Sequence, residues 1–140
     1  MKYGDTKLRV MLDTNILVSA IFFPSIQTRT LITEIICNHN LVLYDYVLEE
    51  LRLVVERKFP AKSIALEHFF SALRFEMIYT SSDMHYTGIP SVRDNKDTPI
   101  LATAILHDID VFITGDKDFL VLDINKPQIM NMAEFLVNYT

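Results

Sequence analysis

The chain has 140 residues and a formal net charge of −5, from 13 basic and 18 acidic side chains. This length fits one domain with its own hydrophobic core, so we expect residues 1–140 to form a single domain. Hydrophobic residues make up 50% of the chain and glycine only 3 residues, which excludes a disordered or low-complexity protein. The acidic balance argues against broad electrostatic binding to nucleic acid, although clustered acids that hold a divalent cation would reverse the local sign.

The sequence predicts a cytoplasmic protein without a membrane segment. Its longest apolar stretches, such as residues 16–23, are too short to span a bilayer, and residues 1–5 lack the apolar region of a signal peptide. The single cysteine, Cys37, excludes an internal disulfide and a thiolate zinc cluster. We expect Cys37 to be a small buried side chain.

The first part of the chain alternates short apolar runs with amphipathic segments. Residues 9–12 predict a buried strand, and residues 15–23 predict a helix that ends at Pro24. A second helix follows, and then a buried strand at residues 41–44. The apolar face of this second helix consists of Leu31, Ile32, Ile35 and Ile36.

Two more helices and a strand are expected in the middle of the chain. Asp45 is placed to cap a helix over residues 46–58. The next helix carries apolar residues at helical spacing, and a strand at 77–79 and a polar loop at 81–95 follow. The apolar stripe of that helix is Leu66, Phe69, Phe70 and Leu73.

The last part repeats the alternation. Asp97 is placed to cap a helix that runs to about Leu106 and is apolar nearly all round. Residues 111–114 predict another buried strand, and the chain closes with a short helix from Asp118, a strand at 129–130 and a helix from Ala133. Continuous apolar strands with helices between them predict a three-layer α/β/α fold with a central, mainly parallel sheet of four or five strands.

Four carboxylates stand out by their position in these elements. Asp13 and Asp116 each follow a buried strand, so they would be neighbours if the two strands are adjacent in a parallel sheet. Asp97 begins the helix that leads to the Asp116 strand. Glu50 flanks the buried stripe of its helix, whereas Glu49 lies nearly opposite that stripe and is expected to be a solvated surface acid.

Facing carboxylates repel one another unless a cation joins them, so this constellation predicts a metal site. Hard oxygen ligands suit Mg²⁺ or Mn²⁺. Zinc is disfavoured, because the four histidines share no ligand spacing and are expected on surfaces or at helix ends. These histidines are His39, His68, His85 and His107. A carboxylate-held metal suggests hydrolytic or phosphoryl chemistry, in which the metal lowers the pKa of a bound water.

The sequence resembles the PIN domains, and most of all the toxin components of prokaryotic toxin–antitoxin pairs (VapC-like). Four motifs occur in the order seen in that family, and the resemblance spans about residues 9–136. The motifs are LDTNIL at 12–17, LEEL at 48–51, DTPILATA at 97–104 and TGDKDF at 114–119.

The resemblance implies a Mg²⁺- or Mn²⁺-dependent endoribonuclease that hydrolyses RNA phosphodiester bonds with a metal-activated water. It also implies a cognate antitoxin that holds the enzyme inactive, and often a homodimer. The metal-site residues would be Asp13, Glu50, Asp97 and Asp116, with Asp118 as a fifth, more variable acid. Asn15 and Thr114 match polar residues that orient the site.

The chain departs from this pattern in two places. Asp94 lies three residues before Asp97 and competes for its role, although the distance from Asp97 to residues 102–104 fits the family better. No basic RNA-binding track is evident, and solvated surface positions are the simpler interpretation of the candidate basic residues. These are Arg52, Arg57, Lys58, Arg93, Lys96 and Lys117.

Alternative interpretations stay open at this point. Each acid could serve structure alone: Asp13 and Asp116 as turn or helix caps, Glu50 in a surface salt bridge, and Asp118 as the cap of a short helix. The chain could be a binding module without catalysis, as its negative charge suggests. A Mg²⁺-dependent phosphotransfer or phosphatase domain is disfavoured, since Asn15 stands where a phosphatase needs a second aspartate.

The apolar residues of the second to fourth helices fit either a dimer surface or the core of a monomer.

Overall fold

A computed structural model of the chain describes residues 7–79 and 98–139. Within these ranges five strands form one sheet in the order β3-β2-β1-β4-β5, and every neighbouring pair is parallel. The strands are β1 (Arg9–Leu12), β2 (Asn40–Tyr44), β3 (Glu76–Ile78), β4 (Val111–Ile113) and β5 (Gln128–Met130). The predicted α/β fold is confirmed, with five strands in its parallel sheet.

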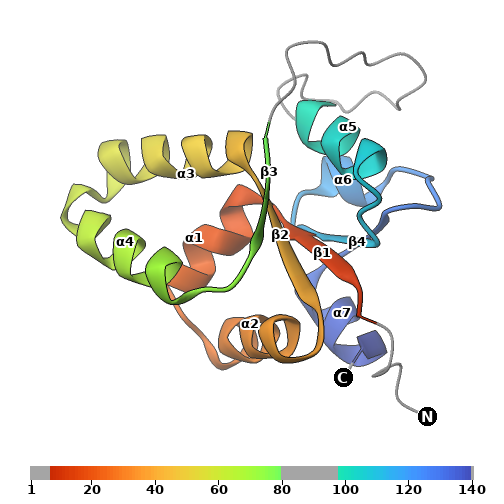
Figure 1. Cartoon of the computed structure of the whole chain (residues 1–140), viewed down its shortest axis with the longest axis horizontal. Coiled ribbons are helices and arrows are strands. Elements are labelled where there is room, and N and C mark those ends of the chain that lie inside the picture. Colours follow the sequence, from red (N-terminus) through yellow and green to blue (C-terminus); the bar gives the residue numbers. More distant parts are fainter. Residues whose placement is uncertain (1–6, 80–97, 140) are drawn as a thin grey trace.

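Helices cover both faces of the sheet. In Figure 1, α1, α3 and α4 lie on one side of the sheet and α5 and α6 on the other, while α2 and α7 pack against each other at the lower end. These described helices are α1 (Thr14–Phe22), α2 (Ile26–Asn38), α3 (Asp45–Lys58), the short 3-10 helix η2 (Pro60–Lys62), α4 (Ser63–Ala72), α5 (Thr98–Leu106), α6 (Lys117–Leu120) and α7 (Met132–Tyr139).

The central strands explain the continuous apolar runs of the sequence. Val10, Met11 and Leu12 of β1 are fully buried, and so are Phe112 and Ile113 of β4. A strand that is covered by helices on both faces cannot alternate between apolar and polar residues, because both sets of side chains enter the core.

The strand order places a topological switch point between β1 and β4. From β1 the chain proceeds through β2 to β3 on one side, and it then returns to form β4 and β5 on the other side. Leu12 pairs with Ile113, so the next residues of both strands leave the same edge of the sheet side by side. In open parallel sheets this point leaves a crevice at the carboxyl ends of the strands.

The first residues of the helices agree only partly with those predicted from the sequence. Asp13 is the N-cap of α1, which therefore begins at Thr14, one residue earlier than expected. The predicted Asp45 cap is wrong, since Asp45 is the first residue of α3, and Tyr44 takes the N-cap position without capping the helix through its side chain. The reason is that β2 runs into α3 with no residue between them.

The predicted burial of Cys37 is wrong, because its side chain is exposed. Leu31 and Ile35 are fully buried on the inner face of α2. Cys37 comes two residues after Ile35, and at 3.6 residues per turn this spacing places it on the far side of the helix.

Helix α4 is apolar but weakly covered. It has no buried residue, although Leu66 and Phe70 of its predicted stripe are half-buried against the core, and Ile64 is 67% exposed. By contrast, α5 has the expected buried character, and Leu101 and Ala104 are fully enclosed.

No single helix among residues 7–79 and 98–139 is long and apolar enough to cross a membrane. Helices α1 and α2 reach the required length and apolar character only as a pair, and a bend of 112° separates them.

Candidate active site

Asp13 occupies the crevice between β1 and β4 and is fixed by hydrogen bonds on both sides. Its backbone N–H donates to the carbonyl oxygen of Ile113 at 3.2 Å, which continues the β1–β4 pairing. Its carboxylate oxygen Oδ1 accepts from the N–H of Ile16 at 3.0 Å, and Oδ2 accepts from the hydroxyl of Thr114. The side chain is 6% exposed. Capping and burial together hold this carboxylate in one orientation.

Thr114 links Asp13 to the segment that follows β4. The Thr114 side chain is fully buried, and its Oγ1 also accepts from the N–H of Asp116 at 3.0 Å. Its own N–H donates to the carbonyl oxygen of Met130 at 3.0 Å. The predicted polar position therefore couples the ends of β1 and β4 through one hydroxyl group.

Asp116 is the N-cap of α6, and its Oδ1 accepts from the N–H of Asp118 at 2.9 Å. The expectation that α6 begins at Asp118 is wrong by one residue, since α6 begins at Lys117. Asp118 lies in the first turn of α6 and is not among the residues that line the cavity described below.

Glu50 and Glu49 separate as the helical wheel predicts. Glu50 is partly buried and lines the same cavity as Asp13 and Asp116. Glu49 is exposed and pairs with Arg52, with Oε2 3.5 Å from Nη1. Helix α3 thus presents one of its two adjacent acids to the crevice.

The cavity at this edge of the sheet has a volume of about 40 Å³. Besides the three carboxylates, its lining residues are Thr14, Asn15, Ile100 and Phe119. Asn15 is exposed, whereas Ile100 and Phe119 are buried apolar walls from α5 and α6. The apolar character of these two residues is the one sequence signal that points to them as walls of the cavity. A volume of this size holds an ion or one or two water molecules.

The electrostatics of the cavity work against a charged Asp13. Burial raises the pKa of the Asp13 carboxyl, and the nearby negative charges of Asp116 and Glu50 raise it further. The hydrogen bonds from Thr114 and Ile16 oppose this effect and lower the pKa. A cation among the three carboxylates would remove both the repulsion and part of the desolvation cost.

The donor set fits a hard divalent cation. Among the described residues, the polar side chains that line the cavity offer oxygen donors, apart from the amide nitrogen of Asn15, and none of them is a histidine or cysteine. The Thr14 hydroxyl oxygen is buried and makes no hydrogen bond within the described parts of the chain.

The described residues do not by themselves complete a metal site. In ranges 7–79 and 98–139, no three His, Cys, Asp or Glu side chains come together closely enough to hold an ion. Asp97, the predicted fourth carboxylate, and its competitor Asp94 lie outside the described residues.

The candidate basic residues that the structure describes do not line the cavity. Arg52, Arg57, Lys58 and Lys117 are exposed, and none of them is among the lining residues. Arg93 and Lys96 fall outside the described residues. The four basic residues that can be placed are solvated, as expected.

Comparison with known proteins assigns this arrangement to a family. Residues 9–118 match the family described as PIN domain. The chain belongs to the PIN domain family. No curated relative matches the sequence.

The fold of this PIN domain is also found among solved structures. One chain in the crystal structure of VapBC2 from Rickettsia felis, bound to a DNA fragment from their promoter, superposes with a TM-score of 0.67. The match covers 89% of this chain and 98% of that chain at 23% sequence identity. Similarity at this level concerns the fold.

Proposed function

We propose that this PIN domain, residues 1–140, is a metal-dependent endoribonuclease and the toxin of a type II toxin–antitoxin pair. The observation that carries the proposal is the position of Asp13, Glu50 and Asp116, which line one cavity at the carboxyl ends of β1 and β4. Three acids from three separate elements repel one another and lower the stability of the metal-free fold. Their shared position is explained if it serves to bind a cation. Membership of the PIN domain family supports phosphodiester chemistry at this position.

The proposed cofactor is Mg²⁺ or Mn²⁺, held by Asp13, Glu50, Asp116 and Asp97. When bound, such an ion lowers the pKa of a water molecule and shields the charge of a phosphodiester. Asp13 supplies a carboxylate that Thr114 and the N–H of Ile16 hold in place. Attack of water on phosphorus that breaks the bond to the 3′-oxygen would leave a 5′-phosphate and a 3′-hydroxyl on the RNA, as the resemblance to the PIN domains implies.

The other residues have supporting roles in this proposal. Thr114 positions Asp13 and the backbone of Asp116 relative to each other. Asn15 is exposed and lines the cavity, where it would help to orient the site. Ile100 and Phe119 would limit the access of bulk water to the inner wall of the cavity. This exclusion of water would strengthen the attraction between the three acids and a bound cation.

Cleavage of a 5′-labelled RNA with Mn²⁺ tests the function. We expect the wild-type chain to cleave, EDTA to stop cleavage, and Asp13→Asn to reduce the rate by about 100-fold or more, because the change removes a charge with little change in volume. Glu49→Gln is the matched control, since it removes an exposed carboxylate beside the site and should keep wild-type activity.

Two outcomes would overturn the proposal. One is equal cleavage by wild-type and Asp13→Asn proteins purified in parallel. The other is the absence of cleavage by a folded wild-type chain that also fails to bind Mn²⁺, which would favour a PIN-like binding module without catalysis.

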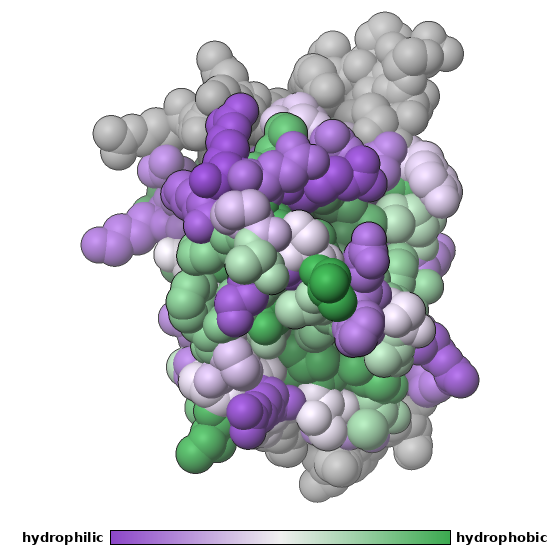
Figure 2. Space-filling view, turned by 90° about the vertical axis from the view of Figure 1, so that its left-hand side faces the viewer, coloured by the Kyte–Doolittle hydropathy of each residue, from purple (hydrophilic) through white to green (hydrophobic). Residues whose placement is uncertain are grey.

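The binding partner that we propose for this chain is an antitoxin, as the similarity in fold to a chain of the VapBC2 complex suggests. The apolar surface between α3 and α4 could receive an apolar segment of that protein. A groove of about 500 Å³ opens there, with Leu66, Phe70 and Phe75 among its apolar lining and Arg52, Glu56 and Glu67 among its polar residues. Figure 2 shows the side of the molecule that carries α3 and α4, where apolar surface is surrounded by hydrophilic side chains.

Two variants of α4 test this docking surface. Leu66 lines the groove, whereas Ile64 is 67% exposed and is not among its lining residues. With the product of an adjacent open reading frame as the binding partner, we expect Leu66→Gln to raise the Kd about tenfold, which is about 1.4 kcal/mol. Ile64→Gln should leave the Kd unchanged. Equal effects of the two variants would place the antitoxin elsewhere.

A further inference from the structure

His39 lies at the opposite end of the sheet from the acidic cavity, where α2 meets β2. It is the C-cap of α2, and its backbone N–H donates to the carbonyl oxygen of Ile35 at 2.9 Å. The predicted position at a helix end is confirmed, but the residue is only 6% exposed. An imidazole so deeply buried needs a structural reason.

The ring of His39 extends the pairing of β1 with β2. Its Nδ1 accepts a hydrogen bond from the backbone N–H of Leu8 at 3.2 Å, and the carbonyl oxygen of Leu8 accepts from the N–H of Asn40 at 2.9 Å. The imidazole thus takes the place of a backbone carbonyl at the start of β1. Because Nδ1 is an acceptor, the neutral ring carries its proton on Nε2.

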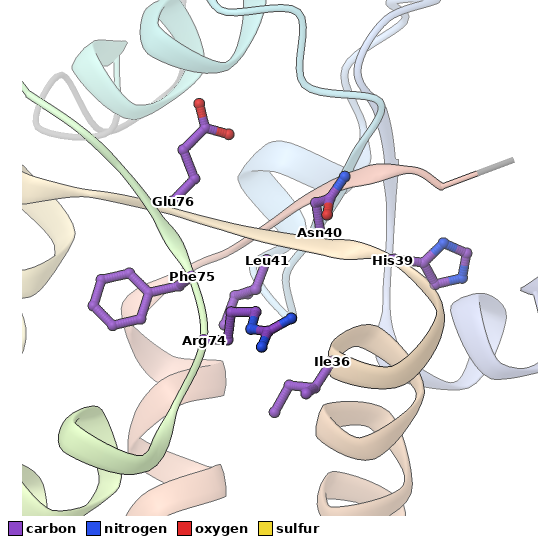
Figure 3. Close-up of a pocket in the computed structure, with 7 residues that line it drawn as sticks. All are labelled: Ile36, His39, Asn40, Leu41, Arg74, Phe75 and Glu76. Atoms are coloured by element: carbon purple, nitrogen blue, oxygen red, sulfur yellow. The ribbon is translucent and has the colours of Figure 1, made fainter.

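The same ring supports α7. His39 contacts Phe135 and Tyr139 edge-to-face, with ring centroids 5.7 and 6.3 Å apart, and Phe135 is fully buried. Figure 3 shows the His39 ring pointing away from the nearby cavity of about 240 Å³, which Arg74 and Phe75 line from the other side. The side chain of His39 therefore serves the contact between α2, β1 and α7.

Few charges face the ring. From α2, Glu34 approaches with Oε1 3.8 Å from Nε2, too far for a hydrogen bond, and Nε2 makes none within the described parts of the chain. From α7, the Tyr139 hydroxyl donates to Oε1 of Gln128 at 2.7 Å, and Glu134 accepts from the N–H of Asn131 at 3.2 Å. From the β1 side the contact is the backbone amide of Leu8.

We propose that His39 is a pH-sensitive latch, which in its neutral form holds α7 and the start of β1 against α2 and releases them when it is protonated. A second proton on Nδ1 would face the N–H of Leu8, so two donors would meet where one hydrogen bond existed. It would also place a positive charge between buried aromatic rings, which the Glu34 carboxylate, with Oε1 3.8 Å from Nε2, offsets only in part.

The direction of the pH dependence follows from the surroundings. Burial lowers the pKa of His39, and Glu34 only partly opposes this effect. Below the ordinary histidine pKa of about 6.5, the released state therefore binds more protons than the latched state. The latch is fully engaged above about pH 6.5 and weakens as the pH falls through the pKa of the folded protein.

Hydrogen exchange of the whole chain tests this latch. We expect the protection of amides in α7, relative to those in α3 and corrected for intrinsic rates, to fall about tenfold between about pH 7.5 and pH 5.0. His39→Asn is the control, because the Asn Oδ1 can accept from Leu8 and does not titrate. In this variant the α7 amides are less protected at both pH values, but the ratio of α7 to α3 protection should not change with pH.

The titration of His39 by NMR keeps the proposal testable if the variant folds poorly. In the wild-type chain we expect a His39 pKa below the ordinary histidine value of about 6.5. Glu34→Gln should lower the His39 pKa further and move the loss of α7 protection to lower pH by the same amount. A pH-independent ratio of α7 to α3 protection in the wild-type chain would overturn the proposal, as would the same pH dependence in His39→Asn.

Discussion

The hydroxyl group of Thr114 donates its hydrogen to the carboxylate of Asp13, which lies 101 residues earlier in the chain. The same Oγ1 accepts from the N–H of Asp116. One buried hydroxyl therefore connects the two strand-end acids of the proposed metal centre. The connection is possible because β1 and β4 are adjacent and parallel, with Leu12 paired to Ile113.

Thr114→Val should weaken both the fold and the activity. The change keeps the shape of the side chain but leaves one Asp13 oxygen without its donor, so we expect a loss of about 1–3 kcal/mol in the free energy of unfolding. Activity should fall about 10- to 100-fold, as is typical when a group that orients a metal ligand is removed. Urea denaturation and RNA cleavage measure the two effects.

Thr114→Ser is the control for this prediction, since it retains the hydroxyl and should restore most of the activity. Equal activity of the Val variant and the wild-type chain would show that the Thr114 hydroxyl does not position Asp13.

Asp13→Asn should stabilise the metal-free protein at neutral pH. The pKa of Asp13 is raised in the folded state, so between its ordinary value near 3.8 and the folded value the folded chain binds more protons than the unfolded chain. The free energy of unfolding therefore falls as the pH rises through this window. Removing the charge should add about 0.5–2 kcal/mol at pH 7 and little at about pH 3.

Chemical denaturation of the two proteins in EDTA at both pH values measures this difference. A variant that is less stable than the wild-type chain at pH 7 would show that the charged form of Asp13 is not destabilising.

Glu50→Gln and Glu49→Gln should differ sharply in RNA cleavage. Both changes remove one charge from α3, but only Glu50 lines the acidic cavity. We expect the Glu50 variant to lose about 100-fold in rate and the Glu49 variant to stay within about twofold of wild type. Similar rates for the two variants would mean that the orientation of α3 does not select Glu50.

Two variants of Asp116 separate its role as a helix cap from its proposed role in catalysis. Asp116→Asn keeps an oxygen that can cap α6, so its thermal stability should match that of the wild-type chain, while its activity should be lost. Asp116→Ala removes the cap as well and should cost about 1 kcal/mol in addition. If both variants retained activity, Asp116 would be a helix cap and no more.

Most of the fold could be predicted from the sequence, because the strongest sequence signals are local. The buried strands are continuous apolar runs, such as Val10 to Leu12, and parallel pairing places the residues that follow them at one edge. The separation of Glu50 from Glu49 followed from helical periodicity alone. These features depend on spacing within one element or on the parallel direction of two strands.

The remainder depends on contacts between elements, which spacing does not encode. Asp45 has the chemistry of a cap, but β2 leads into α3 without a connecting residue, and the cap position falls to Tyr44. Cys37 has a small apolar side chain, but it lies on the solvent side of α2. The burial of His39 arises from Leu8, which directly precedes β1, and from Phe135 of α7. The pairing of β1 with β2 brings Leu8 to His39, and the packing of α7 against α2 brings Phe135 to the same ring.

Titration with Mn²⁺, followed by calorimetry and by the melting temperature, tests the proposed metal centre most directly. We predict that the wild-type chain binds one or two ions and melts at a higher temperature with Mn²⁺, since a ligand that binds only the folded state stabilises it. Asp13→Asn should lose both effects, and Glu49→Gln should retain them. A folded wild-type chain that shows neither binding heat nor a change in melting temperature would contradict the metal centre.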